Sequence, residues 1–300
     1  MEIEAQARLT VSNIDDSFGS IEWHETTPIL NNLMTSGAEL TFSPLAPGLE
    51  ADVVKVTQGE EQFVLKVWNK HSKPDVQRQY RLLKNLHRQQ IRISEPIGYG
   101  RTENGDALLL TRYHGPSVTK LSPSKFQKIA ATLADIHRLP TDKLESGVLA
   151  RYDFVGYFYP GIEAFPAMNE ELNRLVALAD IKMERVIHGD FNLGNILEEH
   201  GQYTIIDWTN GQLGDPRFDL SWACLLLRIY VSESKSLTFL YKYQEEMPVT
   251  TAELEIFEAL ACLRWLLLDR TEGVPKHADT MKKVKKIVRT NRCLNECVLL

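Results

Sequence analysis

Two neighbouring stretches, residues 186–197 and 205–208, constrain the possible fold and chemistry of this chain more than any other part of it. They read VIHGDFNLGNIL and IIDW. Each has an apolar run suited to a short buried strand, next to polar residues that favour special backbone geometry. The polar side chains include one carboxylate (Asp190), an amide five residues later (Asn195) and a second carboxylate after a short hairpin (Asp207). We therefore expect a compact, oxygen-rich cluster here.

This cluster suits a magnesium-dependent reaction on phosphate. Asn and Asp oxygens are hard ligands, and Mg²⁺ takes only a few protein groups because it keeps waters and binds substrate phosphates. Asn195 and Asp207 are the predicted magnesium ligands, which leaves Asp190 to accept a proton from an attacking hydroxyl. Phosphoryl transfer needs little more, because it depends mainly on positioning and charge neutralisation.

The motif resembles the aminoglycoside phosphotransferase and choline kinase family. The matching residues are His188-Gly189-Asp190 with Asn195, the Ile-Asp-Trp of residues 206–208, and the run GDPRFDL at residues 214–220. The resemblance covers about residues 40–222. It implies an α+β, two-lobed protein-kinase-like fold with a small antiparallel sheet in the N-lobe and a mainly helical C-lobe. It also implies ATP and Mg²⁺ as cofactors and a small-molecule hydroxyl as acceptor.

The resemblance suggests three parts. Residues 1–39 are expected to form an N-terminal extension packed on the N-lobe, although the sequence gives them no position. Residues 40–113 would form the N-lobe, with the nucleotide-binding sheet and one helix. Residues 114–300 would form the C-lobe, with the catalytic loop, the metal site and the acceptor pocket.

The N-lobe pattern begins with expected strands at residues 40–45, 52–57 and 63–68. In kinase-like folds a loop between such strands covers the ATP phosphates. Here that loop contains only Gly48, so less backbone can approach the phosphates closely. Lys66 is expected to reach the α- and β-phosphates. Its alternative role is that of a surface lysine between buried neighbours.

The resemblance implies a helix over residues 75–89 with a glutamate that orients this lysine. The best-aligned position in this sequence is Gln79. Glutamine can accept a hydrogen bond from an ammonium group, but without charge assistance. Asn104-Gly105 then predicts a hairpin between strands at residues 97–101 and 107–112. The hairpin leads into Tyr113 and His114, the expected hinge with the adenine against its backbone.

The C-lobe reads as helices. Apolar residues from 126 to 137 have helical spacing after a cap at Ser122 or Ser124. We expect His137 to be a core or cap histidine and His188 to brace the catalytic loop by hydrogen bonds to backbone. Asp219 is expected to begin a helix and to cap backbone N–H groups, including those of the catalytic loop. Helices are expected at residues 219–231, 236–246, 251–270 and 275–292.

The segment of residues 144–166 is rich in turns and has five aromatic residues from Tyr152 to Tyr159. It resembles the variable insertion in which the family builds its acceptor pocket. The alternative is a loop held by aromatic packing. An aromatic cage for a quaternary ammonium group, as a choline kinase needs, could come from the same residues.

Charge is distributed unevenly. Basic residues outnumber acidic ones in residues 40–139, whereas acidic residues are twice as many as basic ones in residues 140–275. This suits a polyphosphate and a cationic co-substrate, although unevenly charged solvated faces would give the same counts. The apolar runs fall short of the roughly 20 residues that span a bilayer. The four cysteines form no metal-binding pattern and fit a reducing compartment. We expect a cytoplasmic protein that binds neither nucleic acid nor membrane.

These observations predict an ATP- and Mg²⁺-dependent phosphotransferase that acts on a hydroxyl of a small molecule, with an aminoglycoside-like, amine-bearing acceptor as first choice. Choline, amino-acid and sugar acceptors stay open because the fold does not fix the substrate. A nucleotide-binding pseudokinase is the rival, favoured by Gln79 and the glycine-poor loop. A protein kinase is disfavoured because no activation segment is evident between Asp207 and Asp219.

Overall fold

The computed structural model of the chain divides into two compact units, and each is described by itself. The structure describes residues 18–37, 39–45, 51–68, 72, 74–119 and 121–294. Unit 1 comprises the described residues up to Pro116 together with Thr204–Thr209, and unit 2 comprises the others. Asp207 is therefore part of unit 1, whereas Asp190 and Asn195 are part of unit 2.

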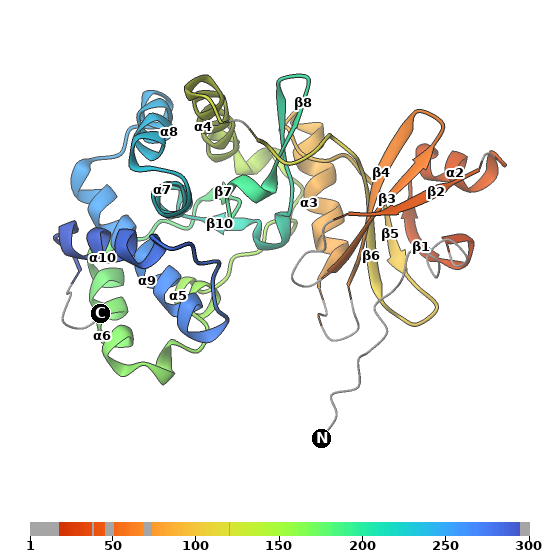
Figure 1. Ribbon diagram of the computed structural model, residues 1–300. Helices are drawn as coiled ribbons and strands as arrows, with labels where there is room; N and C mark the ends of the chain where they lie inside the picture. Colours follow the sequence, from red (N-terminus) through yellow and green to blue (C-terminus); the bar gives the residue numbers. More distant parts are fainter. Residues whose placement is uncertain are drawn as a thin grey trace. The chain divides into compact units, whose positions relative to one another are not determined.

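Unit 1 is built on a six-stranded antiparallel sheet with the strand order β1-β5-β6-β4-β3-β2 (Figure 1). The turns that join β3 to β4 and β5 to β6 contain Gly59 and Gly105, both with positive φ. All five strands predicted between residues 40 and 112 are present. The strands are β1 Glu22–Thr26, β2 Thr41–Pro44, β3 Ala51–Gln58, β4 Glu61–Trp68, β5 Pro96–Arg101 and β6 Ala107–Arg112.

One face of this sheet carries the core of unit 1. Successive side chains of a strand point to opposite faces, so Leu65 and Val67 enter the core while Lys66 points to the other face. Leu30 and Leu33 of helix α2 (Pro28–Thr35) and Phe18 of the 3-10 helix η1 (Phe18–Ser20) belong to the same core. The core face is thus covered, and Lys66 lies on the half-exposed face.

The N-terminal segment had no predicted position, and part of it extends the sheet. β1 pairs with β5, and α2 follows it after a cap at Thr27, whose Oγ1 accepts from the N–H of Leu30 at 3.3 Å. β1 consists of alternating exposed and half-buried residues, most of them polar, so its hydrophobic pattern is weak. Helix α3 (Val76–Arg88) begins after Asp75, which accepts from the N–H of Arg78 at 2.9 Å.

Unit 2 is mainly helical, with short paired strands (Figure 1). β7 (Arg185–Ile187) pairs with β10 (Gln212–Gly214), and β8 (Ile196–Glu199) pairs with β9 (Gln202–Ile205). The α-helices are α4 Pro123–Arg138, α5 Phe154–Phe158, α6 Pro166–Ala179, α7 Pro216–Tyr230, α8 Glu233–Glu246, α9 Thr251–Thr271 and α10 Thr280–Thr290, and the 3-10 helices η2 Thr141–Lys143, η3 Ile162–Ala164 and η4 Leu193–Asn195. A further 3-10 helix, η5 (Trp208–Asn210), follows Asp207, and its first two residues belong to unit 1.

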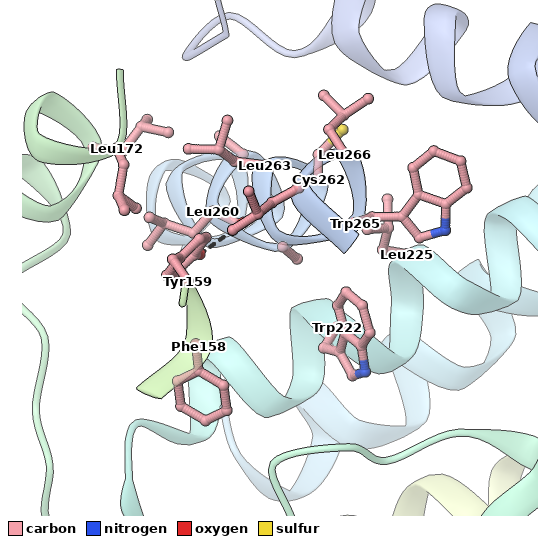
Figure 2. Close-up of a cluster of buried hydrophobic side chains, with 14 of the residues drawn as sticks. Phe158, Tyr159, Leu172, Trp222, Leu225, Leu260, Cys262, Leu263, Trp265 and Leu266 are labelled. Atoms are coloured by element: carbon pink, nitrogen blue, oxygen red, sulfur yellow. Dashed lines mark hydrogen bonds between the residues drawn. The ribbon is translucent and has the colours of Figure 1, made fainter. Parts of the chain in front are cut away.

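The core of unit 2 lies where α7 and α9 pack together, with α5, α6 and α10 contributing side chains. Figure 2 shows Trp222 of α7 and Trp265 of α9 in this cluster. Tyr159 joins it and donates a hydrogen bond from its hydroxyl to the carbonyl of Leu260 at 2.8 Å (Figure 2). Large apolar side chains from distant parts of the sequence thus hold unit 2 together.

The sequence located α4 and α7 to α10 of unit 2 but misplaced some of their boundaries, and it did not predict α6. α7 begins at Pro216 rather than at residue 219, because Asp215 caps it by accepting from the N–H of Arg217 and proline favours the first turn. α8 begins at Glu233 rather than 236, and α10 begins at Thr280 rather than 275. The segment predicted as turns at residues 144–166 also contains α5 and η3.

The mixture of an antiparallel sheet followed by a helical part agrees with the predicted α+β class. Within the described residues, no helix combines the length and the apolarity needed to cross a bilayer.

Candidate active site

The predicted site residues are distributed over both units. Unit 1 contains Lys66, Gln79, Tyr113, His114 and Asp207. Unit 2 contains His188, Asp190, Asn195 and Asp219. Gly48 lies outside the described residues.

In unit 1 the structure brings Lys66 and Asp207 together. The Lys66 ammonium lies 3.3 Å from Oδ1 of Asp207, and the Lys66 side chain is 23% exposed. The backbone of Asp207 is left-handed (φ +64°), a conformation that costs free energy for a residue other than glycine and is common at functional sites. Thr209 holds the carboxylate by donating from Oγ1 to the same Oδ1 atom at 2.9 Å.

Gln79 does not fill the role predicted for it as the hydrogen-bond partner of Lys66. Its Nε2 donates to Oγ1 of Thr209 at 3.1 Å, and the neighbouring Arg78 donates to the carbonyl of Thr209 at 2.9 Å. Helix α3 is thereby connected to Asp207 through Thr209. The neutral amide suits this position, because an amide can donate to a hydroxyl whereas a carboxylate cannot.

The expected hinge residues follow β6. The N–H of Tyr113 donates to the carbonyl of Gln62 at 3.0 Å, which continues the pairing of β6 with β4. The ammonium of Lys55, in β3, lies 4.5 Å from the centre of the Tyr113 ring. His114 is half-buried, and Gly115 after it has φ +85°. The main chain therefore turns directly after the two residues predicted to contact adenine.

In unit 2 the catalytic stretch forms a tight loop after β7. Gly189 has φ +79°, and a Cβ atom there would lie 2.8 Å from the backbone oxygen of Asn210. Only glycine fits this position without strain. His188 is fully buried, and its Nδ1 accepts from the N–H of Asp190 at 3.3 Å. The imidazole therefore bonds the backbone of the loop.

The Asp190 carboxylate is held by three N–H groups. Trp222 Nε1 donates to Oδ1 at 2.9 Å, while the side-chain amides of Asn192 and Asn195 donate to Oδ2 at 3.1 and 3.4 Å. The Asn195 amide also donates to the carbonyl oxygen of Asp190 at 3.1 Å. Both oxygens of the carboxylate are thus oriented, and Asp190 itself is half-buried rather than enclosed.

Asp219 fixes the backbone that leads into this loop. It is fully buried within the first turn of α7, and its carboxylate accepts from the N–H groups of His188 at 2.8 Å and Gly189 at 3.0 Å. The prediction that Asp219 begins the helix was wrong, because Asp215 occupies that position. The contact with backbone N–H groups of the catalytic loop nevertheless exists.

Asp219 is hydrogen-bonded to the buried side chain of His137, which is hydrogen-bonded in turn to the buried side chain of Tyr243. His137 Nε2 lies 3.1 Å from Asp219 Oδ2, and His137 Nδ1 lies 2.6 Å from the hydroxyl of Tyr243. Burial opposes ionisation of Asp219, but its interaction with His137 and the hydrogen bond from the backbone N–H of His188 outweigh this effect and lower the pKa of Asp219. Burial raises the pKa of Tyr243, which keeps its hydroxyl protonated.

Two residues next to Asp190 were not predicted. Trp222 lies three residues after Asp219 on α7 and donates to Asp190. Arg264 of α9 donates from Nη1 to the carbonyl of Gly189 at 2.9 Å. The Arg264 guanidinium lies 4.2 Å from the centre of the Trp222 ring. Neither residue belongs to the motif that carries the resemblance. An arginine within the apolar run of residues 260–268 was the one available signal, because a charge in such a run needs a buried partner.

The oxygen atoms that could hold Mg²⁺ are few. The Asn195 amide nitrogen donates to Asp190, and the amide oxygen is the atom that can accept a cation. No group of three or more His, Cys, Asp or Glu suited to a metal occurs in the part of the chain that the structure describes. A sparse set of hard oxygens fits Mg²⁺, which takes most of its ligands from water and phosphate.

Comparison with known proteins identifies the family. The profile of the Phosphotransferase enzyme family (APH) matches residues 41–253. No curated protein sequence matches the chain significantly.

Small-molecule kinases are among the solved structures similar to this one. Amicoumacin kinase hAmiN, in complex with AMP-PNP, Ca²⁺ and Ami, has 14% identity and a TM-score of 0.66, covering 93% of this chain and 94% of that chain. Choline kinase LicA from Streptococcus pneumoniae has 20% identity and a TM-score of 0.59, covering 87% and 96%. A thermostable mutant of aminoglycoside phosphotransferase APH(4)-Ia, in ternary complex with ADP and hygromycin B, has 14% identity and a TM-score of 0.64, covering 89% and 99%.

These likenesses show a shared fold and confirm the predicted protein-kinase-like class. The profile covers more than two thirds of the residues and includes every predicted site residue. The chain belongs to the phosphotransferase enzyme family and is an enzyme of that class.

Proposed function

We propose that this enzyme transfers the γ-phosphate of ATP, in the presence of Mg²⁺, to a hydroxyl group of a small molecule. The observation that carries the proposal is the Asp190 carboxylate, oriented by three N–H donors on a loop braced by Asp219. An oriented carboxylate is what a hydroxyl nucleophile needs for proton removal. The similar structures with AMP-PNP and ADP support the choice of nucleotide.

In this proposal each unit contributes its own residues. Asp190 orients the acceptor hydroxyl and accepts its proton, and Lys66 steadies the α- and β-phosphates. Asn195 and Asp207 supply oxygen ligands for the metal, which would neutralise charge on the phosphate oxygens when bound. The backbone of Tyr113 and His114 contacts adenine. The sequence assigns the cover over the phosphates to the loop with Gly48, which lies outside the described residues. His188 and Asp219 support the catalytic loop.

We propose an aminoglycoside-like, amine-bearing acceptor. Residues 140–275 have an excess of acidic side chains, which attracts a cationic substrate. The rings of Tyr152 and Tyr157 stack on each other with centres 4.5 Å apart and planes 8° apart. Because the two rings stack face to face, they cannot enclose a quaternary ammonium group between them. Phe154, Phe158 and Tyr159 are buried in the core. This arrangement favours an aminoglycoside-like acceptor over choline.

A cytoplasmic location is part of the proposal. Cys224, Cys262 and Cys293 are free thiols, as is usual in a reducing compartment.

Thermal unfolding with ATP alone, Mg²⁺ alone and both together tests the nucleotide site. A ligand at about a hundred times its dissociation constant adds roughly 2.7 kcal/mol of stability, which raises the melting temperature measurably. We expect the full shift only with both ligands. Absence of a shift under all three conditions would contradict the proposal. A shift without phosphoryl transfer to any acceptor would instead indicate a nucleotide-binding pseudokinase.

A further inference from the structure

Arg264 is a buried cation at an unexpected place. Its side chain belongs to the residues of unit 2 that are less than one tenth exposed. Burying a charge is costly unless other groups compensate for it. Among the described residues no carboxylate forms an ion pair with Arg264. Its partners are the Gly189 carbonyl and the rings of Trp222, Phe158 and Phe218, at 4.2, 4.8 and 5.8 Å from the guanidinium carbon.

Trp222 connects this cation to the reacting carboxylate. One ring face lies against Arg264, and the indole N–H donates to Asp190 Oδ1 at 2.9 Å. Arg264 in turn holds the carbonyl of Gly189, the residue before Asp190. The two side chains therefore fix the backbone and the side chain at successive positions of the catalytic loop, from two different helices.

We propose that Trp222 and Arg264 form a clamp of positioning residues that sets the orientation of the Asp190 carboxylate toward the acceptor hydroxyl. The inference rests on the proposed role of Asp190. An aspartate side chain can rotate, and small errors in the position of a reacting group cost much of the rate. A rigid indole held by a stacked guanidinium suppresses that rotation. The asparagine amides restrain Oδ2, so the clamp acts on Oδ1.

The substitution W222F isolates the hydrogen bond, because phenylalanine retains an aromatic ring against Arg264 and lacks the N–H group. Its matched control is W265F. Trp265 is equally buried in the same core (Figure 2), and its indole N–H donates to the Tyr230 hydroxyl at 3.0 Å. Each variant loses one indole hydrogen bond in the same core. If loss of packing or stability were the cause, both variants should therefore lose activity to a similar extent.

We expect W222F to lower kcat about tenfold, the loss typical of one hydrogen bond to a charged group. The KM for nucleotide should change less than about twofold in the same variant. W265F should retain the kcat of the wild-type enzyme. Equal kcat values for W222F and W265F would overturn the proposal.

R264K tests the second member of the clamp, because lysine retains the charge but lacks the planar group that stacks on Trp222. We expect kcat to fall at least as far as in W222F. The double variant should lose less than the product of the two single losses, since both act on the same carboxylate. Independent, multiplicative effects would contradict a clamp.

A readout that does not need activity is the ¹⁵N–¹H spectrum of the five indole groups. The Trp222 signal is identified by its absence in W222F. Replacing the carboxylate in D190N should shift this signal more than the other four, because a charge-assisted hydrogen bond is lost. An unshifted Trp222 signal would overturn the clamp. A wild-type protein that fails to phosphorylate any acceptor, yet shows the shift, would contradict the proposed function alone.

Discussion

The Lys66 ammonium nitrogen lies 3.3 Å from Oδ1 of Asp207, so the lysine pairs with the proposed metal ligand instead of a residue of α3. Gln79 of α3 reaches the same carboxylate indirectly, through the hydroxyl of Thr209. In this arrangement Asp207 orients the lysine, and Thr209 orients Asp207. The phosphates of a bound nucleotide would draw Lys66 away from Asp207 and leave that carboxylate to the metal.

Removing the Thr209 hydroxyl should therefore weaken metal binding. We expect T209V to raise the Mg²⁺ concentration for half-maximal activity about tenfold, as is typical when a group that orients a metal ligand is lost. T209S, which keeps the hydroxyl, should stay near the wild-type value. Titration of activity with Mg²⁺ at saturating ATP gives both numbers. Equal Mg²⁺ requirements of the two variants would show that Thr209 does not position Asp207.

Replacing Lys66 should impair nucleotide binding. We expect K66M to raise the KM for ATP at least about tenfold, because a charge-assisted contact to phosphate is lost. The KM for the acceptor should stay nearly constant. K128M is a suitable control, since Lys128 is an exposed residue of α4 in unit 2. An unchanged KM for ATP in K66M would exclude the assigned role.

Asp190 should be required for turnover rather than for nucleotide binding. We expect D190N to lower kcat by about 10² to 10⁴, the range typical of general-base catalysis, while the dissociation constant for ATP changes little. D142N supplies the control, because Asp142 is exposed. Steady-state kinetics and nucleotide titration measure the two effects separately. If D190N turned over as fast as D142N, another group would have to accept the proton.

Asp219 should contribute to stability in a pH-dependent way. Burial disfavours its charge, but His137 and His188 outweigh this and lower its pKa in the folded state. Such a carboxyl adds its full stability above the unfolded pKa of about 3.9, and loses it as pH falls through the lower folded pKa. We expect D219N to lose about 3 kcal/mol of unfolding free energy at pH 7, as when a buried pair is broken.

Urea unfolding at pH 7 and at pH 3 measures this contribution. The difference between wild type and D219N should be largest at pH 7 and should shrink at pH 3, where protonation begins to remove the wild-type advantage. A difference that stays the same at both pH values would mean that the charge of Asp219 does not stabilise the fold.

The sequence predicted the strands at residues 52–57, 63–68, 97–101 and 107–112 because alternation and turn residues are local signals, such as Asn104-Gly105 before β6. β1 was not predicted, because it is an edge strand of mostly polar residues with little hydrophobic alternation. Asp219 was placed at a helix start, although Asp215 and Pro216 offered better cap chemistry. Two aspartates four residues apart could each cap the start of this helix, and the prediction chose Asp219 instead of Asp215.

The site was predictable only where one motif contains its residues. Asp190 and Asn195 lie within six residues of sequence, and the structure joins them by a hydrogen bond. Trp222 and Arg264 reach the same loop from helices that are distant in sequence, and packing alone brings them there. Gln79 was assigned by its helix position to Lys66, but the side chain bonds Thr209 instead. No local pattern distinguishes these partners.

The most direct test of the account is transfer of the γ-phosphate from labelled ATP to a panel of aminoglycosides, with choline, amino acids and sugars included. We predict that the wild-type enzyme labels at least one aminoglycoside only when Mg²⁺ is present, and that D190N labels none at a comparable rate. Transfer that is equally fast in D190N, or that proceeds without a divalent cation, would contradict the assignment of Asp190 and of the metal ligands.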